Sequence, residues 1–254
     1  MENNANEGIK ETKNEAIIEC KNLTKDFDGF KALQNLNLTV NKGEIFAFIG
    51  PNGAGKTTTM NILVGLIEPT EGDAIINGYS IVKNPIEVKR NIGFLPESVY
   101  LYSSLTARQN VRYIADLNGG VKEERINDVL DMVGLQSAKD RKAGQFSKGM
   151  RQRLGVACVL VKNPKVLFLD EPTSGLDPTG KMDIQILLKK LSKEGMTIFY
   201  SSHILGEVED IASRVGILYQ GKLQRILEGN EIEKVAEIYK EITAVRSEIP
   251  KTTG

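Results

Sequence analysis

The sequence is poor in cysteine and shows no excess of charge of either sign. Its 254 residues include only two cysteines, Cys20 and Cys158, and each lies in an apolar context. We therefore expect buried free thiols in a reducing compartment, not a disulfide framework. Lys plus Arg and Asp plus Glu both number 33, so the net charge is zero. This balance gives no reason to expect nucleic acid as a partner.

Long hydrophobic runs are also missing. No segment approaches the ~20 apolar residues that a membrane-spanning helix needs. Residues 1–15 are rich in Asn, Glu and Lys and contain no apolar core of a secretory signal. We expect a disordered tail over 1–15 and a soluble, cytosolic chain, which leaves a membrane-embedded partner possible. The length fits one α/β domain, with or without an inserted subdomain.

The strongest motif is a glycine-rich segment that fits the phosphate-binding pattern G-x-x-x-x-G-K-[ST]. The apolar run 45–49 precedes it and predicts a buried strand, and residues 57–64 have helical character, which is the context that the motif needs. Lys56 is expected to bridge the β- and γ-phosphates of a nucleotide, and Thr57 to hold Mg²⁺. The alternative is a glycine-rich turn with a chance lysine. The segment consists of Gly50, Pro51, Asn52, Gly53, Ala54, Gly55, Lys56, Thr57 and Thr58.

A second motif places two carboxylates after an apolar run. Val166–Leu169 predicts a central strand, and Asp170 and Glu171 follow it directly. Ligand sites of open α/β sheets lie at the carboxyl ends of strands. Asp170 is the natural ligand for Mg²⁺, and Glu171 can polarise the water that attacks the γ-phosphate. Solvated acids at a strand end are the alternative.

The rest of the chain predicts strands, then helices, then an alternation of both. Before the glycine-rich segment, and shortly after it, strand patterns cover 17–20, 36–40 and 74–78. Helical patterns dominate 98–161: a capping box at 106–109 opens a helix to Leu117, a second runs over 122–133, and Ser147 caps a third to Val161. Strands at 166–169 and 197–201 then alternate with helices at 178–193 and 204–212.

The last part of the chain predicts a hairpin and a helix. Residues 215–219 and 222–226 form strand patterns around Gln220-Gly221. From Asn230 onward, apolar residues recur at helical spacing, which predicts an amphipathic helix that docks on the domain or on a partner. These apolar residues are Ile232, Val235, Ile238, Ile242 and Val245.

Two further motifs flank the Asp170-Glu171 strand. Phe146-Ser147-Lys148-Gly149-Met150 precedes it, and Ser174-Gly175-Leu176-Asp177 follows it. Together with the glycine-rich segment they resemble the ABC ATPase family, whose signature is Leu-Ser-Gly-Gly-Gln and whose later loop is Ser-Ala-Leu-Asp. Ser147 and Gly149 match the signature, whereas Lys148 and Met150 depart from it in a way that looks like the type-2 exporter branch. Read alone, Ser147 could simply cap a helix.

The resemblance covers residues 16–227 and implies roles for further residues. His203, the only histidine, corresponds to the family's switch histidine, which contacts the γ-phosphate and orients the water, with a structural role as the alternative. Glu97 stands where most of the family has a glutamine that reaches Mg²⁺ or water, with a solvated acid after a proline as the alternative. Phe27 matches the aromatic residue that stacks on adenine, with ordinary packing as the alternative. Tyr100 and Tyr102 lie in the region that faces a membrane subunit, and packing within the insert would explain them equally well.

The resemblance also implies an architecture and a function. The fold class is α/β: a P-loop NTPase core with a mixed sheet, an antiparallel β subdomain and an inserted helical subdomain. We expect the ATPase domain over 16–228, its helical insert at about 98–161, and a C-terminal helix and tail over 229–254. The function implied is that of the ATP-hydrolysing subunit of an ABC transporter, with ATP and Mg²⁺ as cofactors.

The family's working unit is a head-to-tail dimer, homodimer or heterodimer. In it, each ATP bound by Gly50–Thr58 is closed by the other subunit's Ser147 and Gly149, with Asp177 at the interface. The resemblance further implies a separate membrane permease, and hence a cytoplasmic protein at the inner face of the cell membrane. A soluble ABC ATPase that drives an assembly complex is the alternative. A nucleic-acid-remodelling ATPase is disfavoured by the neutral charge.

Overall fold

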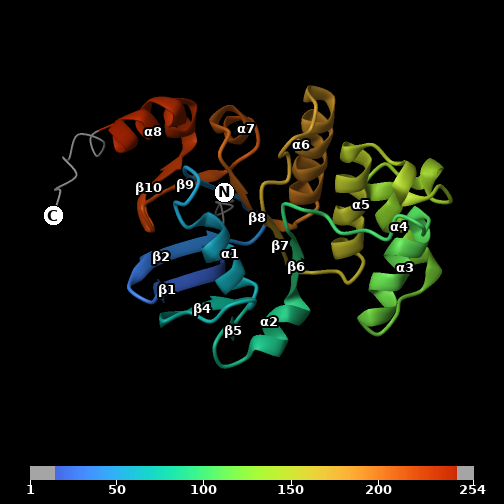
Figure 1. The fold of residues 1–254 in the computed structure, drawn as a ribbon, viewed down its shortest axis with the longest axis horizontal. Coiled ribbons are helices and arrows are strands. Elements are labelled where there is room, and N and C mark those ends of the chain that lie inside the picture. Colours follow the sequence, from blue (N-terminus) through green and yellow to red (C-terminus); the bar gives the residue numbers. More distant parts are fainter. Residues whose placement is uncertain (1–14, 245–254) are drawn as a thin grey trace, which may run out of the picture.

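The computed structural model describes residues 15–244. The tail expected over 1–15 therefore lies outside the described residues except for Glu15, as does Val245 of the C-terminal pattern. Two sheets and the helices that pack around them make up the described part (Figure 1). Within it, no helix has the length and apolar character needed to cross a bilayer.

The central layer is a six-stranded sheet in the order β10-β9-β3-β8-β7-β6. Strands β9, β3, β8, β7 and β6 are parallel neighbours, whereas β10 pairs antiparallel with β9 as the predicted hairpin. The mixed sheet expected from the sequence is thus confirmed. The strands are β3 (Ile45–Ile49), β6 (Ile92–Leu95), β7 (Val166–Leu169), β8 (Thr197–Ser202), β9 (Arg214–Tyr219) and β10 (Lys222–Glu228).

The second sheet is antiparallel, in the order β2-β1-β4-β5. Its first two strands are far longer than the sequence pattern predicts: β1 spans Ala16–Phe27 and β2 spans Phe30–Asn41, followed later by β4 (Glu71–Ile76) and β5 (Tyr79–Ser80). The turn between β1 and β2 is Asp28-Gly29, with φ values of 49° and 95°, the geometry of a two-residue hairpin loop.

A shared core joins the two sheets. Helix α1 (Lys56–Leu63) contributes the buried Met60, Ile62 and Leu63, and α2 (Pro85–Asn91) contributes Val88. The aromatic rings of the central sheet lie in this core and contact one another: those of Phe46 and Phe199 stack with centroids 5.4 Å apart. Burial of such apolar surface is the main force that holds the layers together.

Three helices gather at one end of the molecule (Figure 1). They are α3 (Ala107–Leu117), α4 (Glu123–Met132) and α5 (Lys148–Leu160), with short 3₁₀ turns at Gln136–Ala138 (η1) and Ala143–Gln145 (η2). The predicted capping box is confirmed, because Thr106 accepts from the backbone N–H of Gln109 and the Gln109 side chain accepts from that of Thr106. Ser147 caps α5 as predicted.

The remaining helices pack beside β8 and β9, two strands from the last part of the chain. They are α6 (Pro178–Lys193), α7 (Leu205–Glu209), the 3₁₀ turn η3 (Gly229–Lys234) and α8 (Val235–Ala244). The predicted helix over 204–212 is wrong in length: α7 ends at Glu209, and Ile211 and Ala212 donate back to Val208 in a final turn before the chain enters β9. Helix α8 packs on the domain, since Val235 and Ile238 are buried in its core.

Candidate functional site

The candidate site lies where the carboxyl ends of four neighbouring strands meet. Strands β3, β8, β7 and β6 are adjacent and parallel, so the segments that follow them emerge at the same edge of the sheet. The glycine-rich segment follows β3, Asp170 and Glu171 follow β7, His203 follows β8, and Glu97 follows β6. The topology alone therefore brings these predicted residues to one edge of the sheet.

The glycine-rich segment is a loop whose shape requires its glycines. A Cβ on Gly50 would stand 2.3 Å from the backbone oxygen of Leu218, and one on Gly55 would stand 2.4 Å from that of Ala32. Gly55 also has a φ of +106° and precedes the first residue of α1. The loop thus packs directly on neighbouring backbone, and its own N–H groups and the N-terminus of α1 can face an anion.

Lys56 lies inside this loop. Its side chain is 6% exposed, and its ammonium donates to the backbone oxygen of Gly50 at 2.7 Å. The same ammonium lies 3.5 Å from a carboxylate oxygen of Glu171. A buried lysine held between a carbonyl and a carboxylate supplies a fixed positive charge in the phosphate-binding loop. We call this loop, Gly50–Thr58, the phosphate cradle.

The two carboxylates after β7 point to different partners. Asp170 accepts from the hydroxyl of Ser201 at 2.6 Å, and the same Ser201 oxygen accepts from the backbone N–H of Glu171 at 2.9 Å. Glu171 has a φ of +48°, a left-handed conformation that is uncommon outside glycine and that persists only where the surroundings impose it. Ser201 on β8 is one of these constraints.

His203 completes a chain of contacts across the site. Its Nδ1 lies 2.7 Å from the second carboxylate oxygen of Glu171, so the ring donates to the carboxylate when Nδ1 carries the proton. One oxygen of Glu171 therefore faces Lys56 and the other faces His203. Glu171 is nearly buried and His203 is exposed, so the pair lies at the boundary between protein and pocket.

These groups line a pocket of about 440 Å³. Glu97 also lines it and accepts from the hydroxyl of Ser174 at 3.0 Å, which ties the segment after β6 to the loop after β7. Phe27 does not line the pocket; it is exposed on the hairpin with the Lys25 ammonium 5.0 Å from its ring centroid. The lining residues are Phe30, Ala32, Pro51, Asn52, Gly53, Ala54, Gly55, Lys56, Thr57, Thr58, Glu97, Glu171 and His203.

The sequence predicts oxygen atoms of Thr57, Asp170 and Glu97 as ligands of a divalent cation, and of these residues Thr57 and Glu97 line the pocket. Hydroxyl and carboxylate oxygens suit Mg²⁺, which retains waters and binds mainly to substrate phosphates. Within residues 15–244 no cluster of three or more His, Cys, Asp or Glu side chains could hold a metal by itself. This set of oxygen donors suits a cation that binds mainly to nucleotide phosphates.

Ser147, Gly149 and Asp177 lie away from this pocket and close to one another. Ser147 accepts from the N–H of Met150 at 3.2 Å, and Asp177 caps α6 by accepting from Gly180 at 3.2 Å. A Cβ on Gly149 would lie 3.6 Å from the Cα of Gly180, so the two helix N-termini are neighbours. None of the three predicted residues lines the pocket formed by the same chain.

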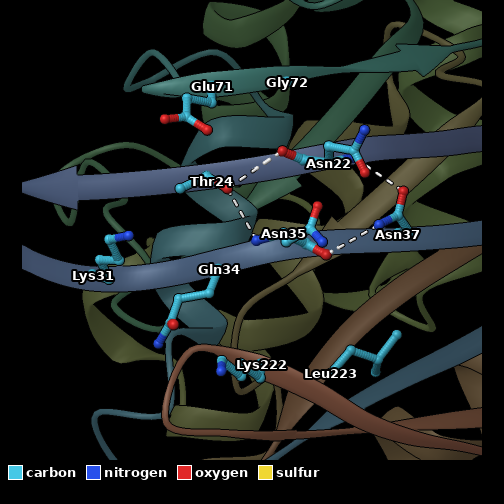
Figure 2. Close-up of a pocket in the computed structure, with 10 residues that line it drawn as sticks. All are labelled: Asn22, Thr24, Lys31, Gln34, Asn35, Asn37, Glu71, Gly72, Lys222 and Leu223. Carbon is cyan, nitrogen blue, oxygen red and sulfur yellow. Dashed lines mark hydrogen bonds between the residues drawn. The ribbon is translucent and has the colours of Figure 1, made fainter.

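A larger hollow of about 740 Å³ lies elsewhere, between the β1-β2 hairpin and β10 (Figure 2). Several of its polar side chains form hydrogen bonds within the irregular hairpin: Asn37 accepts from the backbone N–H of Asn22, and Thr24 accepts from that of Asn35. Asn22 and Asn35 both have positive φ values, as expected of bulged strands. We assign this hollow to the structure of the hairpin, since it shares no lining residue with the phosphate pocket.

Some residues of the site were not identified from the sequence. Phe30 is exposed and lines the pocket, directly after the Asp28-Gly29 turn; that dipeptide signals a tight hairpin and could have drawn attention to it. Ser201 was assigned to a strand without a role, because its contact with Asp170 joins residues far apart in the chain. Thr59, which donates to Gly55 at 2.8 Å, stabilises the first turn of α1.

Comparisons with known proteins agree with this geometry. Residues 33–174 match the ABC transporter family. The chain is 44% identical over 219 residues to the bacitracin transport ATP-binding protein of Bacillus licheniformis, covering 86% of this chain and 72% of that protein. It is 40% identical over 223 residues to the lantibiotic transport ATP-binding protein of Streptococcus pyogenes, covering 88% and 96%.

A solved structure is similar as well. The dimeric post-hydrolysis state of an ATP-binding cassette bound to ADP and Pi superposes with a TM-score of 0.74 at 30% identity, over 83% of this chain and 98% of that one. The phosphate cradle, the carboxylates after β7, the family match and these relatives lead to one conclusion. The chain belongs to the ABC transporter family and is an ATP-binding subunit with ATPase activity.

Proposed function

We propose that this chain binds ATP together with Mg²⁺ at the pocket beside Gly50–Thr58 and hydrolyses it to drive export through a separate membrane permease. The observation that carries the proposal is the convergence of Lys56, Glu171 and His203 on one pocket. A nucleotide phosphate needs the cradle and the lysine, and its hydrolysis needs a base beside them. One edge of the sheet supplies both.

The residues of the pocket divide the work. The glycine loop and Lys56 bind the phosphates, with Lys56 exchanging its contact with the Gly50 carbonyl for the β- and γ-oxygens. Glu171 accepts a proton from the attacking water, and His203 holds that carboxylate and contacts the γ-phosphate. Thr57, Asp170 and Glu97 would hold Mg²⁺, which when bound neutralises phosphate charge.

Phe27 and Phe30 are both candidates to stack on adenine, and Phe30 is the one that lines the pocket.

We propose that the active unit is a dimer in which two ATPase subunits face each other. Ser147, Gly149 and Asp177 form helix N-termini that lie outside their own chain's pocket. Helix N-termini attract anions, so in a head-to-tail dimer they would close over the ATP held by the other subunit. The dimeric cassette with ADP and Pi supports this arrangement. The second subunit is another copy of this chain or a close relative.

Export is favoured by the named relatives, which serve bacitracin and lantibiotic transport. Since no helix within 15–244 could cross a bilayer, the transport path would belong to a separate permease, and this subunit would act at the inner face of the cell membrane. Hydrolysis then shifts the equilibrium between the closed and open states of the ATPase dimer, and this motion changes the conformation of the permease. The domain limits 16–228 and the helical insert at about 98–161 stay part of this proposal.

The permease would dock near Tyr100 and Tyr102. Tyr100 is 89% exposed and Tyr102 is 50% exposed, so two large aromatic side chains reach the surface in one short segment. Both line an apolar groove of about 190 Å³ between the segment after β6 and the helices α3 and α5. Glu97 lies in the same segment and lines the nucleotide pocket, so only a few residues would separate the docking surface from that pocket.

Affinity purification of this chain from its native cells, followed by co-expression with the multi-span membrane protein that it captures, tests the proposal. We expect the two proteins to co-purify and the permease to stimulate ATP hydrolysis, and the double variant Tyr100→Ser/Tyr102→Ser to lose association while keeping its own ATPase activity. Undiminished association of that variant would exclude this docking surface. Association with a soluble scaffold in place of any membrane protein would favour the assembly ATPase.

A further inference from the structure

A buried polar cluster lies behind the pocket and is not used by the chemistry above. Glu207, on α7, is buried, and its carboxylate accepts from the hydroxyl of Thr173. The other carboxylate oxygen forms an ion pair with the ammonium of Lys181 on α6 at 2.9 Å, without the alignment of a hydrogen bond. Glu207 and Thr173 do not line the nucleotide pocket. A buried carboxylate is costly unless it is paired in this way, so the cluster requires an explanation.

The cluster connects to Glu171 through a short loop. Thr173 lies two residues after Glu171, and the loop is closed by hydrogen bonds from Ser174 to Glu171 at 3.0 Å and from Leu176 to Thr173 at 3.2 Å. Glu171 itself has a φ of +48°, which needs support from outside the loop. Ser201 supplies support on one side, and the Thr173–Glu207 bond supplies it on the other.

The cluster also connects to His203. Glu207 is on the helix that follows His203, and its backbone N–H donates to Ile204 at 3.2 Å. Tyr200 is on β8, three residues before His203. Its hydroxyl is buried without a hydrogen-bond partner among the described residues. Burial, and then the charges of Glu207 and Asp210, raise the pKa of Tyr200, so the carboxylate of Glu207 lies close enough to the Tyr200 hydroxyl for its charge to act there.

We propose that Glu207 is a positioning residue for ATP hydrolysis: by binding Thr173 and Lys181 it fixes the loop that carries Glu171 against the segment that carries His203. The contact of His203 with Glu171, 2.7 Å long, depends on the relative position of those segments. Small displacements of a catalytic base lower the rate far more than they lower substrate binding. The inference rests on the catalytic roles proposed for Glu171 and His203.

The test measures steady-state ATP hydrolysis and calorimetric ADP binding in single variants. Thr173→Val and Glu207→Ala should lower kcat about tenfold while KM for ATP and the affinity for ADP change by less than about twofold, because the phosphate cradle is untouched. Thr173→Ser keeps the hydroxyl and should restore most of kcat. Glu209→Ala, which truncates an exposed acid on the same helix, is the matched control for Glu207→Ala and should behave as wild type.

The double variant Thr173→Val/Glu207→Ala should be no slower than the slower single variant, because both changes break one contact. Independent, multiplying effects would overturn the proposal, as would an unchanged kcat in Thr173→Val. Should Glu207→Ala fail to fold, the comparison of Thr173→Val with Thr173→Ser still decides. Glu171→Gln in the same assay tests the catalytic role of Glu171 separately from the positioning role of Glu207. If this variant hydrolyses ATP normally, the assignment of Glu171 is wrong whatever the Glu207 variants do.

Discussion

The carboxylate of Glu171 is shared between two basic groups from different strands. One oxygen lies 3.5 Å from the Lys56 ammonium, which follows β3, and the other lies 2.7 Å from Nδ1 of His203, which follows β8. A carboxylate held from both sides has little freedom to rotate. It is oriented before any substrate arrives, which lowers the reorganisation needed at the moment of reaction.

We predict that Glu171→Gln lowers ATP hydrolysis about 100-fold or more while leaving ATP binding largely intact, because a general base contributes on this scale. The amide keeps the size of the side chain but cannot accept the proton. With ATP and Mg²⁺ the variant should elute as a dimer in gel filtration. Glu194→Gln, an exposed acid at the end of α6, is the control. A variant that stays monomeric and hydrolyses normally would refute the assignment.

We predict that Lys56→Met weakens ATP binding at least about tenfold, since the buried ammonium is the fixed positive charge of the cradle. Calorimetric titration with ATP measures the loss. Glu171 keeps its contact with His203 in this variant, so the fold should survive, and the melting temperature checks this. Lys42→Met, which removes an exposed lysine paired with Glu15, should bind ATP as wild type does. Unchanged affinity in Lys56→Met would mean that ATP binds elsewhere.

We predict that Gly55→Ala destabilises the protein by about 2–4 kcal/mol, combining an unfavourable positive φ with steric overlap. Its φ is +106° and its Cβ would lie 2.4 Å from the backbone oxygen of Ala32. Gly206→Ala is the matched control, because a Cβ there meets nothing within 4 Å and should change stability by less than about 1 kcal/mol. Urea unfolding of both variants makes the comparison. Equal midpoints would contradict the steric argument.

We predict that the two cysteines resist alkylation in the native protein. Burial raises the pKa of Cys20 and that of Cys158 from 9.0 to about 12, and only the thiolate reacts. Iodoacetamide at pH 8 should label neither thiol until urea is added. Complete labelling of the folded protein would show that these sites open readily.

The same shifts give stability a pH dependence with a definite sign. The folded state holds the thiol protons more tightly than the unfolded state does. The contribution of the two thiols to the free energy of unfolding is therefore fully present below pH 9.0 and is lost as the pH rises toward about 12. The double variant Cys20→Ser/Cys158→Ser should show a shallower alkaline loss of stability in urea titrations at pH 8, 9 and 10. A slope equal to that of the wild type would assign the loss to other groups.

Local patterns predicted much of the secondary structure correctly. The capping box at Thr106, the cap at Ser147 and the helix that begins at Pro178 are set by residues within a few positions of one another, so a sequence contains them directly. The length of β1 and β2 was missed for the opposite reason. Those strands are irregular, and they are held by cross-strand pairing with shifts in register, which no local periodicity reveals.

The sequence by itself determined which chemistry is present. A glycine loop with Lys56, followed later by Asp170-Glu171, specifies phosphate binding and a base, because these properties reside in residue types at fixed spacing. Only the tertiary structure decided how they meet. The adjacency of β3, β8, β7 and β6 brings Lys56, Glu171 and His203 into contact, and the same packing places Ser147 and Asp177 outside that pocket. Strand order is fixed by burial of the whole core, a cooperative property that no single segment contains.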